Sequence, residues 1–168
     1  MHLTFAENKI IQIDGAQLIY KNFAGRGDKY NREGDRNFAV RIEDPEIANA
    51  LMDDKNKYGA GWNVKIKPPR EEGDDPFMYL PVKIKFNGRG PNVYVKTGNN
   101  TVRLTEDTIS WLDKITILSV DLDIRPYDDV LNGKPFRSAY LQSMYVEQEV
   151  DRFADRMGGG FAGLNDEF

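Results

Sequence analysis

The clearest hydrophobic pattern in the chain is a strict two-residue alternation in three segments, 62–67, 80–86 and 93–96. Apolar residues occupy one side of each segment, and mostly lysines occupy the other. Alternation of this kind is typical of strands that bury one side and expose the other. We therefore predict three strands here, with these residues on their buried sides: Trp62, Val64, Ile66, Leu80, Val82, Ile84, Phe86, Val93 and Val95.

The opposite side of these strands collects positive charge around an aromatic ring. It carries Lys65, Lys67, Lys83, Lys85, Lys96 and Tyr94. Like charges placed opposite one another on neighbouring strands repel, so a sheet that concentrates them usually has a reason. A polyanion lying across the sheet would neutralise this charge. The alternative is an ordinary solvated sheet face, because exposed lysine is common.

A long polar segment at 24–36 contains three glycines and several turn-forming residues, and it predicts a loop. Its net charge is only +1, so its bulk charge is not distinctive. Tyr30 lies among its four cations and offers a ring on which a base can stack, beside side chains that reach phosphates. The alternative is a hairpin loop with local ion pairs. The four cations are Arg26, Lys29, Arg32 and Arg36.

Two helices and four further strands are predicted around these segments. Asp44 and Pro45 begin a helix as cap and first residue, and Thr105 is expected to cap a shorter helix through Leu112. Strands are expected at 10–23, with a break at Gly15, and also at 37–42, 115–124 and 138–147. The strand 115–124 is expected to bury Leu118, Val120, Leu122 and Ile124.

The connection between the last two strands holds a second group of cations and rings. Its turn signal is Asn132-Gly133, a pair that favours tight hairpins. Around it lie Arg125, Tyr127, Lys134, Phe136 and Arg137. Of these, Arg125 and Tyr127 are predicted to contact a nucleic acid.

Short strands, long loops and few helices predict a mostly β fold, an antiparallel barrel or sandwich. We favour an OB-fold-like Greek-key barrel with one or two short helices, in which a strand face and two loops meet a ligand. A jelly roll remains the alternative. We expect residues 1–150 to form this binding domain and residues 151–168, which include a Gly158–Gly160 run, to form a flexible, mildly acidic tail.

Composition narrows the chemistry that the chain can perform. Its 168 residues contain no cysteine and a single histidine, His2, which is expected at a mobile terminus. Disulfides, zinc sites and histidine-based catalysis are therefore not expected. The chain lacks an apolar run long enough to span a membrane and a visible secretion signal, so we expect it in the cytoplasm. The net charge of −4 is compatible with a local basic surface if charges are segregated.

Several segments resemble a group of phage-encoded single-stranded DNA-binding proteins. These segments are 29–38, 62–70, 119–128 and 139–143. The resemblance covers most of the first 150 residues. It implies an OB-type barrel without catalysis or cofactor, which protects single strands during phage DNA replication or recombination in the host cytoplasm. It also implies that a C-terminal tip, here Asp166, Glu167 and Phe168, docks replication or recombination proteins.

Two other functions remain open from the residues themselves. A nuclease would hold magnesium with paired carboxylates, and Asp121 and Asp123 share one strand side, with Asp128 and Asp129 nearby. A protein-interaction module that blocks a host factor would fit the negative net charge and the terminal Phe168.

Overall fold

Ten β-strands of one sheet form most of the structure, a computed structural model that describes residues 1–88 and 90–150. One α-helix and two short 3-10 helices complete the described part. The helices are α1 (Pro45–Asp53), η1 (Glu7–Lys9) and η2 (Ile109–Asp113). The strands are β1 (His2–Phe5), β2 (Ile11–Asp14), β3 (Leu18–Asn22), β4 (Arg36–Ile42), β5 (Lys65–Lys67), β6 (Phe77–Ile84), β7 (Asn92–Thr97), β8 (Asn100–Leu104), β9 (Ile117–Leu131) and β10 (Lys134–Gln148).

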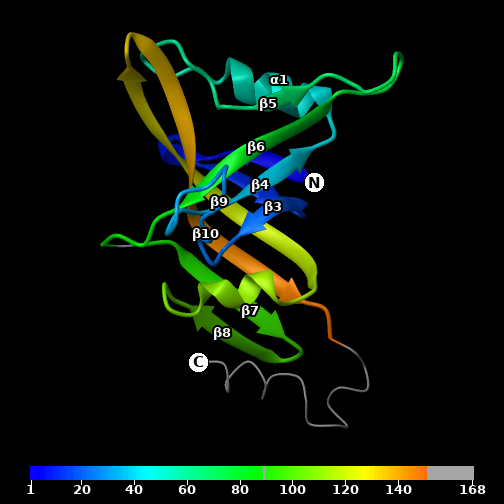
Figure 1. Cartoon of the computed structure of the whole chain (residues 1–168), viewed down its shortest axis with the longest axis vertical. Helices are drawn as coiled ribbons and strands as arrows, with labels where there is room; N and C mark the ends of the chain where they lie inside the picture. Colours follow the sequence, from blue (N-terminus) through cyan, green and yellow to red (C-terminus); the bar gives the residue numbers. More distant parts are fainter. Residues whose placement is uncertain (89, 151–168) are drawn as a thin grey trace.

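The strands follow the order β1-β2-β9-β10-β6-β4-β3, with β5 added to β6 and the pair β7-β8 added to β10 (Figure 1). Most neighbours are antiparallel, but β10 pairs in parallel with both β6 and β7. No pairing joins β1 to β3 within the described residues, so the sheet curves without closing. The predicted class, a mostly β, OB-like and partly open barrel, is confirmed.

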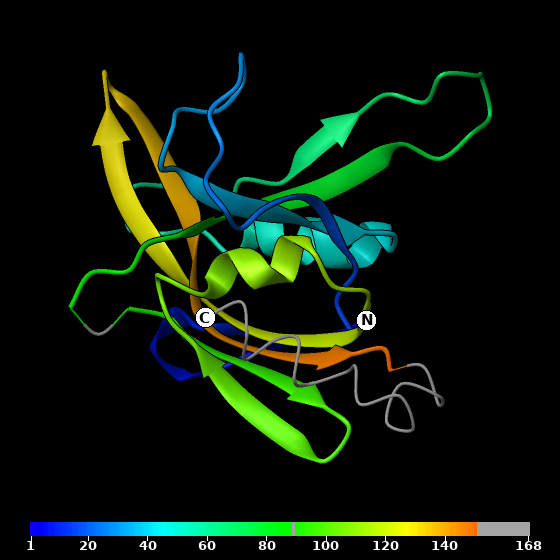
Figure 2. The same cartoon turned by 60° about the horizontal axis from the view of Figure 1, so that its bottom comes forward.

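Strands β9 and β10 form a long hairpin whose far end extends as a two-stranded arm from the body of the sheet (Figures 1 and 2). Each strand has 15 residues. The turn is Asn132-Gly133, where both residues have positive φ, 52° and 78°, as in the tight hairpin turns that match strand twist. The prediction that residues 125–137 form a connecting loop was therefore wrong, apart from the turn itself. Both strands continue through Arg125, Tyr127 and Phe136.

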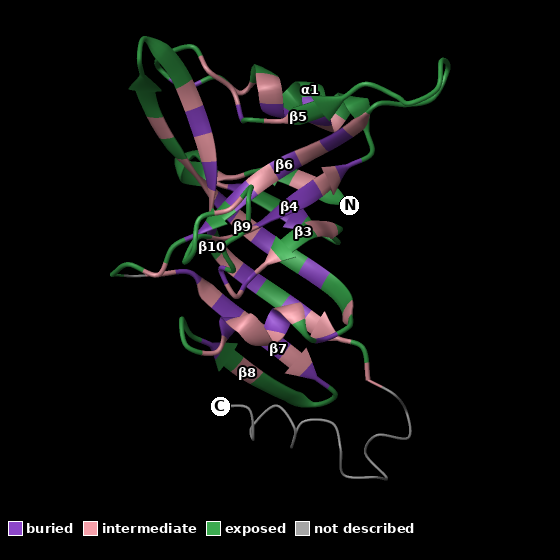
Figure 3. Cartoon of the chain, in the orientation of Figure 1, coloured by how far each residue is buried: buried purple, intermediate pink, exposed green. Residues whose placement is uncertain are grey.

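The predicted alternation is confirmed in β6, β7 and most of β9, where buried and outward positions alternate (Figure 3). Leu118 is an exception, with 61% of its surface exposed. Ser119 pairs with Glu147 and Ile117 with Gln148, so Leu118 is the extra residue of a bulge and turns outward. Ile66 is also exposed, because the short β5 pairs only with the outer end of β6.

The first predicted helix is confirmed with its cap, and the second differs from the prediction in its start and type. Asp44 caps α1 by accepting a hydrogen bond from the Glu46 backbone N–H at 2.9 Å, as expected. The second helix begins later than predicted, after Thr108, and is a 3-10 helix without a side-chain cap. The Thr108 hydroxyl instead accepts from the backbone N–H of Thr105. His2 lies in β1, paired with Asp14, so the expectation of a mobile terminus at this residue was wrong.

A buried polar network attaches the β9–β10 arm to the chain segment after α1. Arg137 is 1% exposed and donates from Nε to Asp128 at 2.8 Å and from Nη1 to the Asp54 carboxylate at 3.2 Å. Its guanidinium lies 5.3 Å from the centre of the Trp62 ring. Asn56 donates to Asp128 at 3.0 Å and to the backbone carbonyl of Phe136. Arg137, which was predicted in the connecting segment, lies instead in β10, where two carboxylates and a ring compensate its charge inside the protein.

The same contacts change the acidity of Asp128. Burial by itself would raise the pKa of this carboxyl, but the hydrogen bonds from Arg137 and Asn56, together with the positive charges of Arg137 and Lys9, lower the pKa below its usual value. A lowered pKa means that the pair contributes its full stability above the ordinary pKa of aspartate. This contribution is lost as pH falls through the lowered, folded-state pKa.

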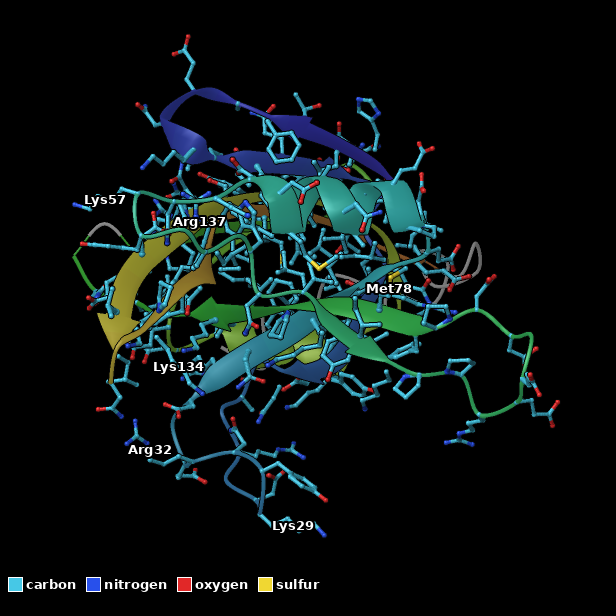
Figure 4. All side chains as sticks on the ribbon, turned by 90° about the horizontal axis from the view of Figure 1, so that it is seen from above. Lys29, Arg32, Lys57, Met78, Lys134 and Arg137 are labelled. Carbon is cyan, nitrogen blue, oxygen red and sulfur yellow. The ribbon has the colours of Figure 1, made fainter. Side chains whose placement is uncertain are left out.

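We predict that Arg137→Met lowers the free energy of unfolding by about 1.5–3 kcal/mol at neutral pH, because it removes the charged hydrogen-bond partner of two partly buried carboxylates. Lys134→Met is the matched control, since Lys134 is exposed on the same strand (Figure 4). It should change stability by less than about 0.5 kcal/mol. The difference should shrink in acid as Asp128 becomes protonated. Equal stabilities of the two variants in urea titrations would contradict a stabilising role for the network.

Candidate nucleic-acid interface

A row of polar side chains crosses five strands on the outside of the sheet. Arg125 on β9 pairs with Tyr140 on β10, which pairs with Lys83 on β6. Lys83 pairs with Asn37 on β4, and Asn37 pairs with Asn22 on β3. Paired residues point to the same side of a sheet. The flanking residues Val82 and Ile84 on β6, Ala139 and Leu141 on β10, and Phe38 on β4 are buried, so this row faces solvent.

Three cations converge on the ring of Tyr140. The Lys83 and Lys85 Nζ atoms lie 5.8 and 5.7 Å from the ring centre, and the Arg125 guanidinium carbon lies 5.3 Å from it. Tyr127 meets Tyr140 edge to face at 5.9 Å, and the Phe136 ring lies 6.1 Å from Tyr127. We name this group the Tyr140 cluster: Lys83, Lys85, Arg125, Tyr127, Phe136 and Tyr140.

The Tyr140 cluster combines the two features that bind single-stranded nucleic acids: a ring on which a base can stack and cations that contact phosphates. Rings and cations attract one another, but three like charges around one ring also repel. An anion held between them removes this repulsion, and a free ring face accepts a stacked base. The phenol of Tyr127 hydrogen-bonds to Asp129 at 3.2 Å, and this bond, together with the charge of Asp129, raises the pKa of Tyr127. Tyr127 therefore stays neutral at physiological pH.

A second group of rings and cations lies farther along β6 and reaches β3, β4 and β5. The Tyr79 ring lies 5.3 Å from Tyr20 and 5.7 Å from Phe77. Lys67 Nζ lies 5.6 Å from the ring centres of both tyrosines. Arg41 is 5.4 Å from the Phe77 ring. We name this group the Tyr79 cluster: Tyr20, Arg41, Lys67, Phe77 and Tyr79.

The predicted loop forms a wall beside both clusters. A hollow of about 490 Å³ lies between its residues Arg32 and Arg36 and the lysines Lys83 and Lys85. A larger hollow of about 990 Å³ reaches from Arg26 and Tyr30 to Tyr20, Lys67 and Tyr79. Asn31 and Asn37 line both hollows and hydrogen-bond to each other at 2.8 Å. The loop thus borders a continuous outer surface from one cluster to the other.

Internal hydrogen bonds hold this loop in one shape. The Asn31 side-chain amide donates to the carbonyls of Arg26 at 2.8 Å and Asp35 at 2.9 Å. The Gly27 N–H donates to the Glu33 carboxylate at 2.6 Å, and Arg36 donates to the Phe23 carbonyl. Such preorganisation lowers the entropic cost of binding. At the outer end Tyr30 is 86% exposed, and Lys29 and Arg32 point away from the strands (Figure 4).

The structure groups most of the predicted contact residues on this surface. Lys83, Lys85, Arg125 and Tyr127 meet in the Tyr140 cluster, Lys67 lies in the Tyr79 cluster, and Lys65 pairs with Tyr79. The loop carries Arg26, Lys29, Tyr30, Arg32 and Arg36. Tyr94 and Lys96 lie elsewhere, paired with Tyr145 and Glu147 farther along β10. Asp166, Glu167 and Phe168 lie outside the described residues.

Sequence reasoning missed four rings and one cation of this surface: Tyr20, Phe77, Tyr79, Tyr140 and Arg41. Tyr140 lies in the predicted strand 138–147, and Tyr79 lies one residue before the predicted strand 80–86. Extending the two-residue alternation to these positions could have placed both rings on the surface. Their partners come from strands far apart in the chain. Tyr20 had no local signal, because its orientation depends on an irregularity in β3.

The acidic residues considered as magnesium ligands have other partners in the structure. The Asp121 carboxylate accepts a hydrogen bond from the Gly15 N–H at 3.0 Å, and Asp128 is paired with Arg137. Partial burial, and then the charge of Asp14, raises the pKa of Asp123. In residues 1–88 and 90–150 no group of three or more histidines, cysteines or acids is placed to hold a metal ion. Nor is any helix in this part of the chain long and apolar enough to cross a membrane.

An OB-type sheet with rings and cations on its outer face is typical of proteins that bind single-stranded nucleic acids. The chain belongs to the family described as "Putative phage ssDNA-binding domain", whose model matches residues 4–159. The resemblance predicted from the sequence is thus confirmed. No curated protein matches the chain.

Solved structures with a similar fold come from bacteriophage Enc34. Its single-stranded DNA-binding protein in complex with ssDNA has a TM-score of 0.57 and 13% sequence identity, covering 90% of this chain and 93% of that one. A C-terminal truncation of the Enc34 protein has a TM-score of 0.54 and 12% identity, covering 90% and 91%. At this identity the likeness shows a shared fold.

Proposed function

We propose that this protein binds single-stranded DNA across the outer face of β9, β10, β6 and β4, with little preference for sequence. The observation that carries the proposal is the convergence of Lys83, Lys85 and Arg125 on the Tyr140 ring. Phosphates neutralise the cations while a base stacks on the ring, and every base has a face that can stack. Family membership supports the same ligand.

We further propose a binding role without catalysis, in phage DNA replication or recombination in the host cytoplasm. The two clusters consist of cations and rings, which are suited to holding a strand. Three acids that border the hollows are already engaged: Asp35 pairs with Arg32, and Asp28 and Asp113 accept hydrogen bonds from backbone N–H groups. The strand would pass the loop at Tyr30, which leaves Tyr94 and Lys96 outside the path.

Charge reversal of Lys83, Lys85 and Arg125 to glutamate should abolish tight binding of single-stranded DNA at moderate salt. Each lost phosphate contact should also reduce the slope of log affinity against log salt by about 0.7, as expected for single strands. Lys96→Glu is the matched control, because Lys96 lies on the same sheet beside Glu147. A triple variant that binds with the affinity and salt slope of the unmodified protein would place the strand elsewhere.

Tyr140→Ala should weaken binding by about 1–3 kcal/mol if a base stacks on this ring. Tyr145→Ala is its control, since Tyr145 is an exposed tyrosine five positions farther along the same strand, beside Tyr94. Fluorescence anisotropy with a labelled oligonucleotide measures both. If Tyr145→Ala costs as much as Tyr140→Ala, the strand also runs along β7, and Tyr94 and Lys96 join the site.

The domain division predicted above is also a proposal: residues 1–150 form the binding domain, and 151–168 form a tail for partner proteins. All ten strands and both clusters lie within the first part. Deleting residues 158–168 should therefore change neither the melting temperature nor the affinity for single-stranded DNA. Tighter binding by the truncated chain, most clearly at low salt, would show instead that the acidic tip competes with DNA.

A further inference from the structure

Tyr20 has a backbone conformation that a tyrosine rarely adopts. Its φ is 51°, in the left-handed region where a bulky side chain is strained. The pairing of β3 with β4 shifts here, because Ile19 pairs with Ala39 but Asn22 pairs with Asn37. One extra residue therefore forms a bulge in β3. A common bulge of this kind places glycine at its left-handed position, yet here a tyrosine stands in that conformation.

The bulge directs the Tyr20 ring across β4 to β6. Its ring meets Tyr79 edge to face at 5.3 Å and Phe77 at 6.5 Å, and Lys67 Nζ lies 5.6 Å above it. Despite these contacts Tyr20 remains 57% exposed. The ring is thus held by its neighbours and still has surface free for a ligand. Strained residues persist where the surrounding structure enforces them, and they concentrate at binding sites.

The hollow in front of this ring leads toward the Tyr140 cluster. Tyr20, Lys67 and Tyr79 line it together with Asn37, which also borders the hollow beside Lys83 and Lys85. Tyr79 and Lys83 point outward from the same strand four residues apart, a separation of about 13 Å. The acids that line this hollow are Asp28 and Asp113.

We propose that Tyr20 forms a second base-stacking subsite, in which the base lies on the Tyr20 ring and its phosphate meets Lys67. One DNA strand then contacts both clusters, running from Tyr140 on β10 past Asn37 to Tyr20 on β3. This inference rests on the proposed function and adds to it the path that the DNA strand takes across the sheet. It also assigns a binding role to a residue that nothing in the sequence pattern marks.

The test combines variants of Tyr20 with oligonucleotides of two lengths. Tyr20→Asn removes the ring and places a residue that tolerates positive φ in the bulge. Its melting temperature should stay close to that of the unmodified protein. Loss of the ring contacts destabilises the fold, and relief of the backbone strain at positive φ stabilises it by a similar amount. Tyr20→Phe keeps the ring. Phe5→Asn is the matched control, since Phe5 is an exposed ring on β1, the strand at the opposite end of the sheet.

The expected result is a length-dependent loss. Tyr20→Asn should weaken binding of thymidine oligonucleotides of about 16 nucleotides about fivefold to 150-fold, and it should hardly affect those of about 4 nucleotides, which can occupy the Tyr140 cluster alone. Tyr20→Phe and Phe5→Asn should bind both lengths normally.

Several results would overturn the second subsite. If Tyr20→Asn binds the longer oligonucleotide normally while Tyr140→Ala does not, the second subsite is refuted and the proposed function stands. If neither change affects binding, the strand binds elsewhere, and the proposed surface and the second subsite both fail. If the unmodified protein does not bind, the proposed function fails as well. A large fall in the melting temperature of Tyr20→Asn with unchanged DNA affinity would assign the ring a purely structural role.

Discussion

The pairing of β10 with three other strands is the constraint on which the structure depends. Antiparallel β9 lies along one edge of β10, and β6 and then β7 lie parallel to it along the other. A bulge at Gln142 lets the strand keep both Leu141 and Met144 buried although they are an odd number of residues apart. Inward residues thus join the core from Ala139 to Val146, while Tyr140 is left outward between β9 and β6. The proposed binding surface exists because β10 brings these distant segments together.

Segregation of charge reconciles an acidic protein with a polyanionic ligand. The net charge is −4, yet the outer face of β6 and its neighbours collects lysines and arginines around two groups of rings. Acids gather on β2 and the neighbouring part of β9, where Asp14 pairs with Asp121. The pKa of Asp123 is raised there, mainly by partial burial and also by the negative charge of Asp14. The acidic region repels DNA, and the basic region beside it attracts and orients the strand. The local electrostatic potential therefore matters more for binding than the net charge of the protein.

The sequence predicted the parts of this surface that depend on local pattern. Lys83 and Lys85 follow from alternation within one strand, and the hairpin turn follows from its Asn-Gly pair. Tyr140 could be placed on an outward side, but its cations come from β6 and β9 through a parallel pairing that no local pattern encodes. The burial of Arg137 could not be predicted, because its charge is compensated by carboxylates 9 and 83 residues away in the chain. Tyr20 was missed because a bulge, with a φ that propensities assign to glycine, determines its direction.

Photo-crosslinking tests the central claim most directly, because it records which residues touch the DNA without altering the protein. Single-stranded DNA in which bromouracil replaces thymine is bound to the full chain and irradiated, and the linked peptides are identified by mass spectrometry. The account predicts links to Tyr140 on β10 and to Tyr20 or Tyr79 on β3 and β6. Links confined to β1, β2 and the acidic part of β9, with none to these tyrosines, would contradict it.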